Sequence, residues 1–290
     1  MSVVNNRPQP KYILLEEFTS KGYKTVDLKT GLDVGHLKLV LEKLAKLHAA
    51  SAMLYNQDET DFMNHQEPNI SDYFKIFHPL FLNCLNACAK AAEKWPGAEE
   101  FAKKLLVLEK NVIDRGEEAF ILEDDEFGVL CHGDLWSNNV MFDYNENNEP
   151  NDAIMLNFGL SYFGSPGIDL SYLLFTSSSN NIKDYEIDIL LQHYHQHLHA
   201  NLIKMNCKRS IPALTDIHNH FLKRGIIGVI YSTLLIPMRF AEHINVKELT
   251  GLVTNTDEGF AFRDGLYESS QLQQRMMFLL NYFDRKGLLD

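Results

Sequence analysis

The chain has 290 residues, 45% of them hydrophobic, and a formal net charge of −12 at pH 7. This length and apolar content suffice for one large domain or two modest ones with a substantial core. The acidic balance and the lack of a Lys/Arg cluster exclude a dedicated nucleic-acid binder, because phosphate backbones need a basic face.

The N-terminus, MSVVNNRPQPKY, lacks the apolar core of a signal peptide. No apolar run reaches the roughly 18 residues that a membrane span needs, so no membrane partner is expected. The four cysteines lack metal-type spacing, and we interpret Cys84 and Cys88, four residues apart on an expected helix, as two buried thiols. Together these features predict a reducing, cytoplasmic compartment.

In chain order, residues 12–18 (YILLEEF) predict a short strand. From Asp33 to about Tyr55, apolar residues recur at helical spacing with charged residues opposite them, which predicts a long amphipathic helix. His48 lies on its apolar stripe, and we favour a core histidine with one hydrogen-bond partner over a catalytic one. Helices are also predicted over 71–94, stopped by Pro96-Gly97, and over 98–119.

An acidic run at 123–126 is interpreted as a solvated turn before the next strand. Ser165-Pro166, a capping hydroxyl followed by proline at the first helical position, predicts a helix from Pro166 to about Ser177. A long loop is expected between Val246 and Arg263. The remaining predicted elements are strands at 128–131, 140–142 and 153–156 and helices at 183–206, 212–241 and 266–286. This pattern predicts one mostly helical α+β domain over residues 1–290.

Polar side chains gather in the run VLCHGDLWSNNVMFD, residues 129–143, between two predicted strands. Asp134 precedes Asn139 by five residues, and the next pair of strands returns Asn157 beside them. Phosphoryl transfer from a nucleotide requires an aspartate for the hydroxyl proton, an amide oxygen on magnesium and a second carboxylate on the metal. The alternative is a plain polar turn between strands.

Together with YILLEEFTSKGYK, LAKLHAASAML, FGSPGIDLSYLLFTS and FDRKGLLD, this run resembles the ecdysteroid kinase-like family of insects. That family is the CHK kinase-like group of the protein-kinase and aminoglycoside-phosphotransferase superfamily. The resemblance spans almost all of residues 12–290. It implies a hinge at 12–18, a kinase-like C-terminal lobe at 19–290, and transfer of phosphate from ATP, with Mg²⁺, to a steroid-like or other small hydroxylated acceptor.

Carried over by position, the resemblance makes Asp134 the catalytic base and Asn139 a magnesium ligand. His132 and Asp169 take structural roles that steady the catalytic loop. The helical region after residue 180 is expected to shape the acceptor pocket. The hinge, whose backbone reads the adenine edge, falls on Leu15, Glu16, Glu17 and Phe18.

Two departures from the family pattern predict impaired activity. Where the family has its metal-binding aspartate, directly before Phe158, this chain has Asn157, which removes a full charge and bidentate capacity from the Mg²⁺ site. Eleven residues precede Tyr12, so we expect the N-terminal lobe, with its phosphate-covering loop and lysine, to be missing. An incomplete gene model explains the second departure but not the first.

Three hypotheses follow from these observations. The first is a small-molecule phosphotransferase, and the two departures predict that it is catalytically impaired. The second is a pseudokinase that binds a small molecule or partner through the helical pocket. The third is a degraded gene product without function.

Other candidate features carry less weight. The run HYHQHLH places His193 and His197 on one helix face and His195 and His199 on another, and we favour a partly solvated face over a metal site. Trp136 either lines the acceptor pocket or packs beneath it. No nucleophile elbow surrounds the serines at 177–179, so a serine hydrolase is not supported.

Overall fold

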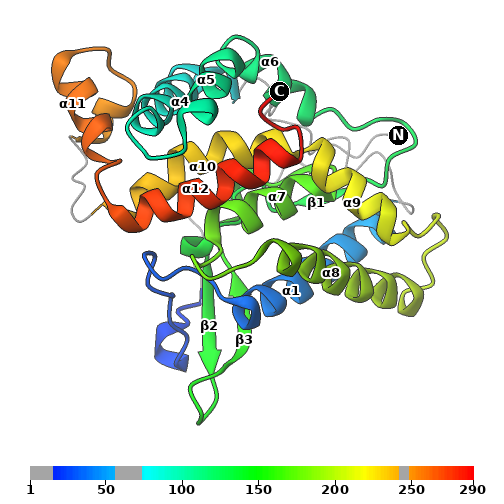
Figure 1. The fold of residues 1–290 in the computed structure, drawn as a ribbon. Coiled ribbons are helices and arrows are strands. Elements are labelled where there is room, and N and C mark those ends of the chain that lie inside the picture. Colours follow the sequence, from blue (N-terminus) through cyan, green and yellow to red (C-terminus); the bar gives the residue numbers. More distant parts are fainter. Residues whose placement is uncertain (1–15, 56–73, 242–247) are drawn as a thin grey trace, which may run out of the picture.

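Helices dominate residues 16–55, 74–241 and 248–290, the parts of the chain that this computed structural model describes. Together with a few short strands they confirm the predicted α+β class (Figure 1). The helices are α1 (Val34–Tyr55), α4 (His78–Ala92), α5 (Glu99–Leu108), α6 (Val112–Ala119), α7 (Pro166–Ser177), α8 (Asp184–Lys204), α9 (Leu214–Lys223), α10 (Gly225–Phe240), α11 (Asp257–Gly265) and α12 (Ser270–Arg285). The strands are β1 (Val129–Cys131), β2 (Val140–Tyr144), β3 (Pro150–Met155) and β4 (Tyr162–Gly164).

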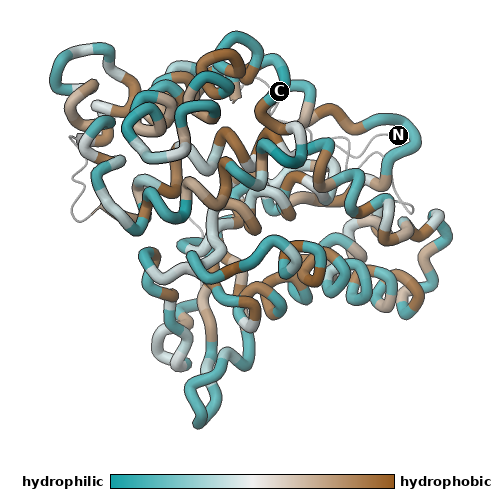
Figure 2. Tube along the Cα trace, viewed as in Figure 1, coloured by the Kyte–Doolittle hydropathy of each residue, from teal (hydrophilic) through white to brown (hydrophobic). Residues whose placement is uncertain are grey.

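The strands form two antiparallel pairs. β1 pairs with β4, with Leu130 opposite Phe163, and β2 pairs with β3, with Met141 opposite Ile154. The β2–β3 hairpin extends away from the helices (Figure 1), and its tip is hydrophilic (Figure 2). The backbone of Lys24 pairs with that of Phe142 on β2, through N–O distances of 2.9 and 2.8 Å. The segment around Lys24 is therefore docked on the hairpin that follows the polar loop.

The predicted helix at 33–55 is confirmed as α1, which lies along α8 (Figure 1). Its apolar stripe, including Leu37, Leu41 and Leu44, is buried, while Lys46 on the opposite side is exposed. This is the arrangement that helical periodicity predicts for a helix packed on one face.

Helix α7 is buried along its whole length and forms the centre of the core. Its start is capped as predicted, because Ser165 Oγ accepts a hydrogen bond from Gly167 N. At its other end the guanidinium groups of Arg239 and Arg275 donate to the carbonyls of Thr176 and Phe175. Burial lowers the pKa of Arg239 to about 10 and that of Arg275 to about 9. The two guanidinium groups donate hydrogen bonds to carbonyls at the C-terminus of α7. Their positive charges also interact favourably with the negative end of the helix dipole.

Several predicted elements have different bounds in the structure. The helix predicted at 98–119 divides into α5 and α6, which pack on different partners, α4 and α10. The helix predicted at 212–241 divides at Arg224 into α9 and α10, bent by 52°. The loop expected between Val246 and Arg263 contains α11, whose start is capped by Thr256 Oγ1. Glu16–Phe18 carry no strand, and residues 12–15 and 71–73 lie outside the described residues.

Arg224, at this bend, contacts the end of the acidic run at 123–126. Residues 123–125 are exposed at a turn as predicted, and only the last residue of the run differs. The Arg224 guanidinium is buried and donates to the carbonyls of Ala119 and Ile121 and to the carboxylate of Glu126. Glu126, the last residue of the acidic run, therefore lies largely inside the protein rather than in solvent. Burial alone raises its pKa, but hydrogen bonds from Arg224 and Lys223 outweigh that effect and lower the pKa of Glu126 to about 2.

Among the described residues, no single helix has the length and apolar character to cross a membrane, although α9 and α10 taken together pass that test as a bent pair.

Candidate functional site

The polar loop His132–Asp134, which we call the HGD loop, follows β1 directly. Gly133 has φ +82°, a backbone conformation that side chains rarely adopt. A Cβ at this position would lie 2.1 Å from the carbonyl oxygen of Leu160. Glycine is therefore required where the loop passes against the segment that follows Asn157.

Asp169, on the first turn of α7, anchors this loop from inside the core. Its carboxylate accepts hydrogen bonds from His132 N at 2.7 Å and Gly133 N at 3.0 Å. His48 Nε2 lies 3.1 Å from the same carboxylate. Burial alone would raise the pKa of Asp169, but the hydrogen bond and charge of His48, with the backbone donors, hold it below its usual value. Asp169 thus holds the backbone of the loop in place.

His48 is a buried core histidine, as its place on the apolar stripe of α1 predicts. It has two partners rather than one: Nε2 faces Asp169 Oδ2, and Nδ1 lies 2.7 Å from the hydroxyl of Tyr194 on α8. The chain Tyr194–His48–Asp169 therefore connects the α1–α8 pair to the HGD loop.

His132 ties the loop to the segment that carries Asn157. Its Nε2 donates to the carbonyl of Leu156 at 2.8 Å, so Nδ1 is the acceptor for Asp134 N at 3.3 Å. The ring packs against Phe158, with ring centroids 4.6 Å apart. The fully buried His132 is placed to position the loop.

Asp134 is half-buried and is held by two side chains. Its Oδ1 accepts from the hydroxyl of Tyr172 at 2.8 Å, and its Oδ2 accepts from Asn139 Nδ2 at 2.8 Å. Sequence reasoning missed Tyr172. The available signal was its spacing of three residues from Asp169 on α7, which places both on neighbouring positions of one helix face.

The structure brings Asn139 and Asn157 to the same carboxylate. Asn157 Nδ2 lies 3.5 Å from Asp134 Oδ2, and Leu156 N donates to Asn139 O at 2.8 Å. Asn157 has φ +65°, in the left-handed region that asparagine and aspartate tolerate best. An aspartate is therefore compatible with the backbone at this position.

These residues fit a magnesium ion only in part. Asn139 directs its Nδ2 at Asp134, which leaves its Oδ1 for a metal. Asn157 adds a second neutral amide, and both oxygens of Asp134 already accept hydrogen bonds. Mg²⁺ prefers carboxylate ligands, so a site built on two amides lacks the charge that usually holds it.

A cavity of about 170 Å³ opens beside Asp134. Apart from Asp134 and the glycine of the HGD loop, apolar and aromatic side chains line it: Phe77, Leu80, Phe81, Leu160, Tyr172, Tyr231 and Leu234. Trp136 is partly buried against the core and does not line this cavity. The lining of this cavity, apolar with one carboxylate at the wall, has the character of a small-molecule site, and the cavity volume is below the roughly 300 to 1,000 Å³ of pockets that hold drug-sized ligands.

The predicted hinge residues lie along the segment that precedes the β2 bridge, and Leu15 lies outside the described residues. The carboxylate of Glu17 accepts hydrogen bonds from Thr19 N and Ser20 N, and hydrogen bonding to these residues lowers its pKa to about 2. Glu16 forms an ion pair with Lys21, and Phe18 packs edge-on against Tyr23. Reading of adenine by this segment stays a prediction.

Comparison with protein families assigns residues 2–207 to a single family model, that of the ecdysteroid kinase-like family. The matched region contains the HGD loop, Asn139, Asn157 and the anchoring Asp169. A search of curated proteins found no match.

Proposed function

The chain belongs to the ecdysteroid kinase-like family, and on this premise we propose that it binds a small, largely apolar alcohol beside Asp134 and phosphorylates it from ATP at a reduced rate. Membership implies a kinase-like small-molecule phosphotransferase. The kinase-like C-terminal lobe, the acceptor and the reduced rate are the proposal.

The setting of Asp134 carries this proposal. Its carboxylate stands at the wall of an aromatic cavity and is fixed by Tyr172 and Asn139. A fixed carboxylate beside an apolar cleft can accept the proton of a bound hydroxyl group while the cleft excludes water. The aromatic lining suits a flat or ring-containing alcohol, and a volume of about 170 Å³ holds a single ring or the hydroxyl-bearing end of a larger molecule such as a steroid.

Asn157 supports the reduced rate. ATP and Mg²⁺ supply the phosphoryl group and neutralise its charge in such enzymes. In this chain Asn139 and Asn157 would hold the metal, and neither contributes a negative charge. Loss of one preorganised electrostatic contact commonly lowers turnover about a hundredfold or more.

A pseudokinase is the second candidate, and the same observation favours it. If two amides do not hold Mg²⁺ at all, the cavity beside Asp134 still binds its ligand without phosphoryl transfer. The two candidates share the ligand and differ in whether the wild type transfers phosphate at all.

The test uses the full chain with Mg-ATP and a panel of hydroxylated steroids and smaller ring alcohols. Thermal unfolding reports binding, and transfer of labelled phosphate reports turnover. We expect stabilisation by at least one alcohol, slow transfer to it, and faster transfer by the Asn157→Asp variant. Asp134→Asn should abolish transfer while the matched variant Asp143→Asn, on the β2 strand, leaves it unchanged.

Each other outcome is decisive. Stabilisation by an alcohol with no transfer by the wild type would support the pseudokinase, and transfer by Asn157→Asp alone would trace the loss to the missing carboxylate. Transfer that is unaffected by Asp134→Asn would contradict the assigned base. No stabilisation by any member of the panel would contradict the proposed ligand class.

A further inference from the structure

A cluster of one carboxylate and two imidazoles lies across the α1–α8 pair, apart from the cavity beside Asp134. Glu42 comes from α1, and His193 and His197 come from α8. Glu42 Oε1 is 3.0 Å from His193 Nε2 and 3.6 Å from His197 Nε2. One ligand atom from each residue lies within 4.8 Å of the other two. The fold thus brings together three metal-binding side chains that are up to 155 residues apart in the chain.

Two of the three separations are close to those of a tetrahedral metal site. Bonds of about 2.0 to 2.1 Å to zinc place neighbouring ligand atoms about 3.3 Å apart. The separations of 3.0 and 3.6 Å lie on either side of that value, and both histidines present Nε2 to the same carboxylate oxygen. The third separation, between the two imidazole nitrogens, is at most 4.8 Å.

The three side chains of this cluster are partly exposed to solvent. The exposed fractions of the side chains are 29% for Glu42, 18% for His193 and 36% for His197. Lys38, one helical turn before Glu42, acts on His193 electrostatically and weakens the site for a cation.

We propose that Glu42, His193 and His197 form a site for zinc or a similar divalent transition metal, with water in the fourth position. Imidazole and carboxylate together are typical ligands of zinc. The site joins α1 to α8 beside the Tyr194–His48 hydrogen bond. A bound metal therefore acts as a clamp on the helix pair that supports Asp169. This role is independent of the proposed phosphoryl transfer.

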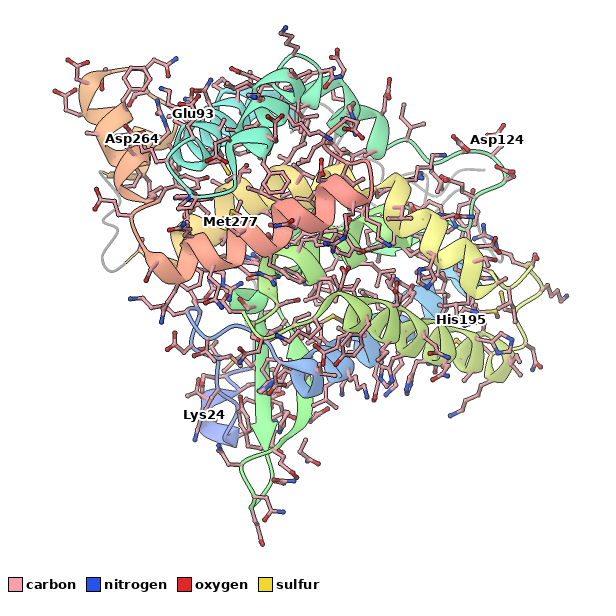
Figure 3. All side chains as sticks on the ribbon, viewed as in Figure 1. Lys24, Glu93, Asp124, His195, Asp264 and Met277 are labelled. Carbon is pink, nitrogen blue, oxygen red and sulfur yellow. The ribbon has the colours of Figure 1, made fainter. Side chains whose placement is uncertain are left out.

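The same helix supplies a matched control. His195 and His199 have the same spacing as the proposed ligands, and Figure 3 shows His195 on α8. Their rings are 5.9 Å apart, and His195 Nε2 donates to the backbone carbonyl of Pro212 rather than facing a carboxylate. This second pair of histidines at helical spacing has no third ligand beside it among the residues that the structure describes.

The experiment measures thermal unfolding of the full chain with and without ZnCl₂, in a Cys207→Ser background. This background removes the one cysteine thiol that is not buried. At zinc about 100 times above its dissociation constant, we expect the melting temperature to rise by about 5 °C. The His195→Ala/His199→Ala variant should show the same rise from its own baseline, and the His193→Ala/His197→Ala variant should show none.

A second readout separates the site from non-specific binding. Co²⁺ bound at the cluster should give the visible absorption of a tetrahedral complex, and Glu42→Ala should weaken its binding about tenfold or more. Lys38→Gln should tighten it, because a repelling charge is removed. Equal zinc stabilisation of both double variants, or unchanged Co²⁺ binding by Glu42→Ala, would overturn the proposal.

Discussion

The two sides of the HGD loop differ in burial and in hydrogen bonding. On the core side, Asp169, His48 and Tyr194 are fully buried and linked by hydrogen bonds of 2.7 to 3.1 Å. On the solvent side, Asn157 is exposed and has one long contact, 3.5 Å, to Asp134. A change on the core side leaves a buried charge unpaired, whereas a change at position 157 disturbs little of the fold. The fold can therefore persist without a carboxylate at position 157.

The largest expected effect is that of Asp169→Asn. This change removes the buried negative charge of Asp169, whose carboxylate is hydrogen-bonded to His48 and to two backbone N–H groups. We expect the free energy of unfolding to fall by about 3 to 5 kcal/mol, as for other broken buried pairs. Urea denaturation measures it, with Asp143→Asn on β2 as a control that should change stability by about 0.5 kcal/mol or less. A loss below about 1 kcal/mol for Asp169→Asn would contradict the asymmetry.

Gly133→Ala should have the next largest effect. The new methyl group would meet Leu160 O at 2.1 Å in addition to the strain of φ +82°. We expect a loss of about 3 kcal/mol in the free energy of unfolding. Gly97→Ala is the matched control, because Gly97 has φ +80° with nothing within 4 Å of its Cβ position. Gly97→Ala should lower the free energy of unfolding by only about 1 kcal/mol. Equal losses in the two variants would contradict the claim that the close contact with Leu160 requires glycine at position 133.

The ion pair between Glu126 and Arg224 lies outside the HGD loop and serves for comparison with the carboxylates of the loop. The pKa of Glu126 in the folded protein is about 2, below the ordinary value of 4.5. The stabilisation is therefore complete above about pH 5 and is lost as the pH falls toward 2. After allowance for solvent screening we expect about 1 to 2 kcal/mol.

Urea denaturation at pH 7 and pH 3 measures this contribution. Glu126→Gln should be less stable than the wild type at pH 7, and the difference should shrink at pH 3. Glu123→Gln is the control, because Glu123 is exposed and shares the partner Lys223. A difference between Glu126→Gln and wild type that does not depend on pH would show that the ion pair is not the cause.

The smallest effect on stability is expected for Asn157→Asp. A second carboxylate near Asp134 Oδ2 adds repulsion between partly solvated charges, which amounts to about 0.5 kcal/mol. Millimolar Mg²⁺ should reverse this loss in the variant and leave the wild type unchanged. Thermal unfolding with and without Mg²⁺ measures both, and a Mg²⁺-independent loss would point to a steric cause.

Local sequence signals predicted most helices and the position of the loop. Helical periodicity located α1, and Ser165-Pro166 fixed the start of α7, because both depend on neighbouring residues only. The strand β4 was missed, since three apolar residues show no alternation and their pairing with β1 depends on tertiary contacts. The division at Arg224 depends on a carboxylate 98 residues away, which no local pattern reports.

The candidate site shows the same division between local features, which the sequence predicts, and tertiary contacts, which it does not. The proximity of Asp134, Asn139 and Asn157 was predictable because their spacing reflects a loop and a hairpin, whereas their catalytic and metal-binding roles stay predictions. Tyr172 was missed because its hydroxyl reaches Asp134 only through the packing of α7 beneath the loop. Glu42 was missed for the same reason, since α1 and α8 meet only in the folded chain.

Calorimetric titration of Mg²⁺ into the wild type and the Asn157→Asp variant tests most directly whether the solvent side of the loop is incomplete. The wild type should bind Mg²⁺ at least tenfold more weakly than the variant, because the added carboxylate supplies both charge and a second oxygen. Equal affinities in the two proteins would contradict the account.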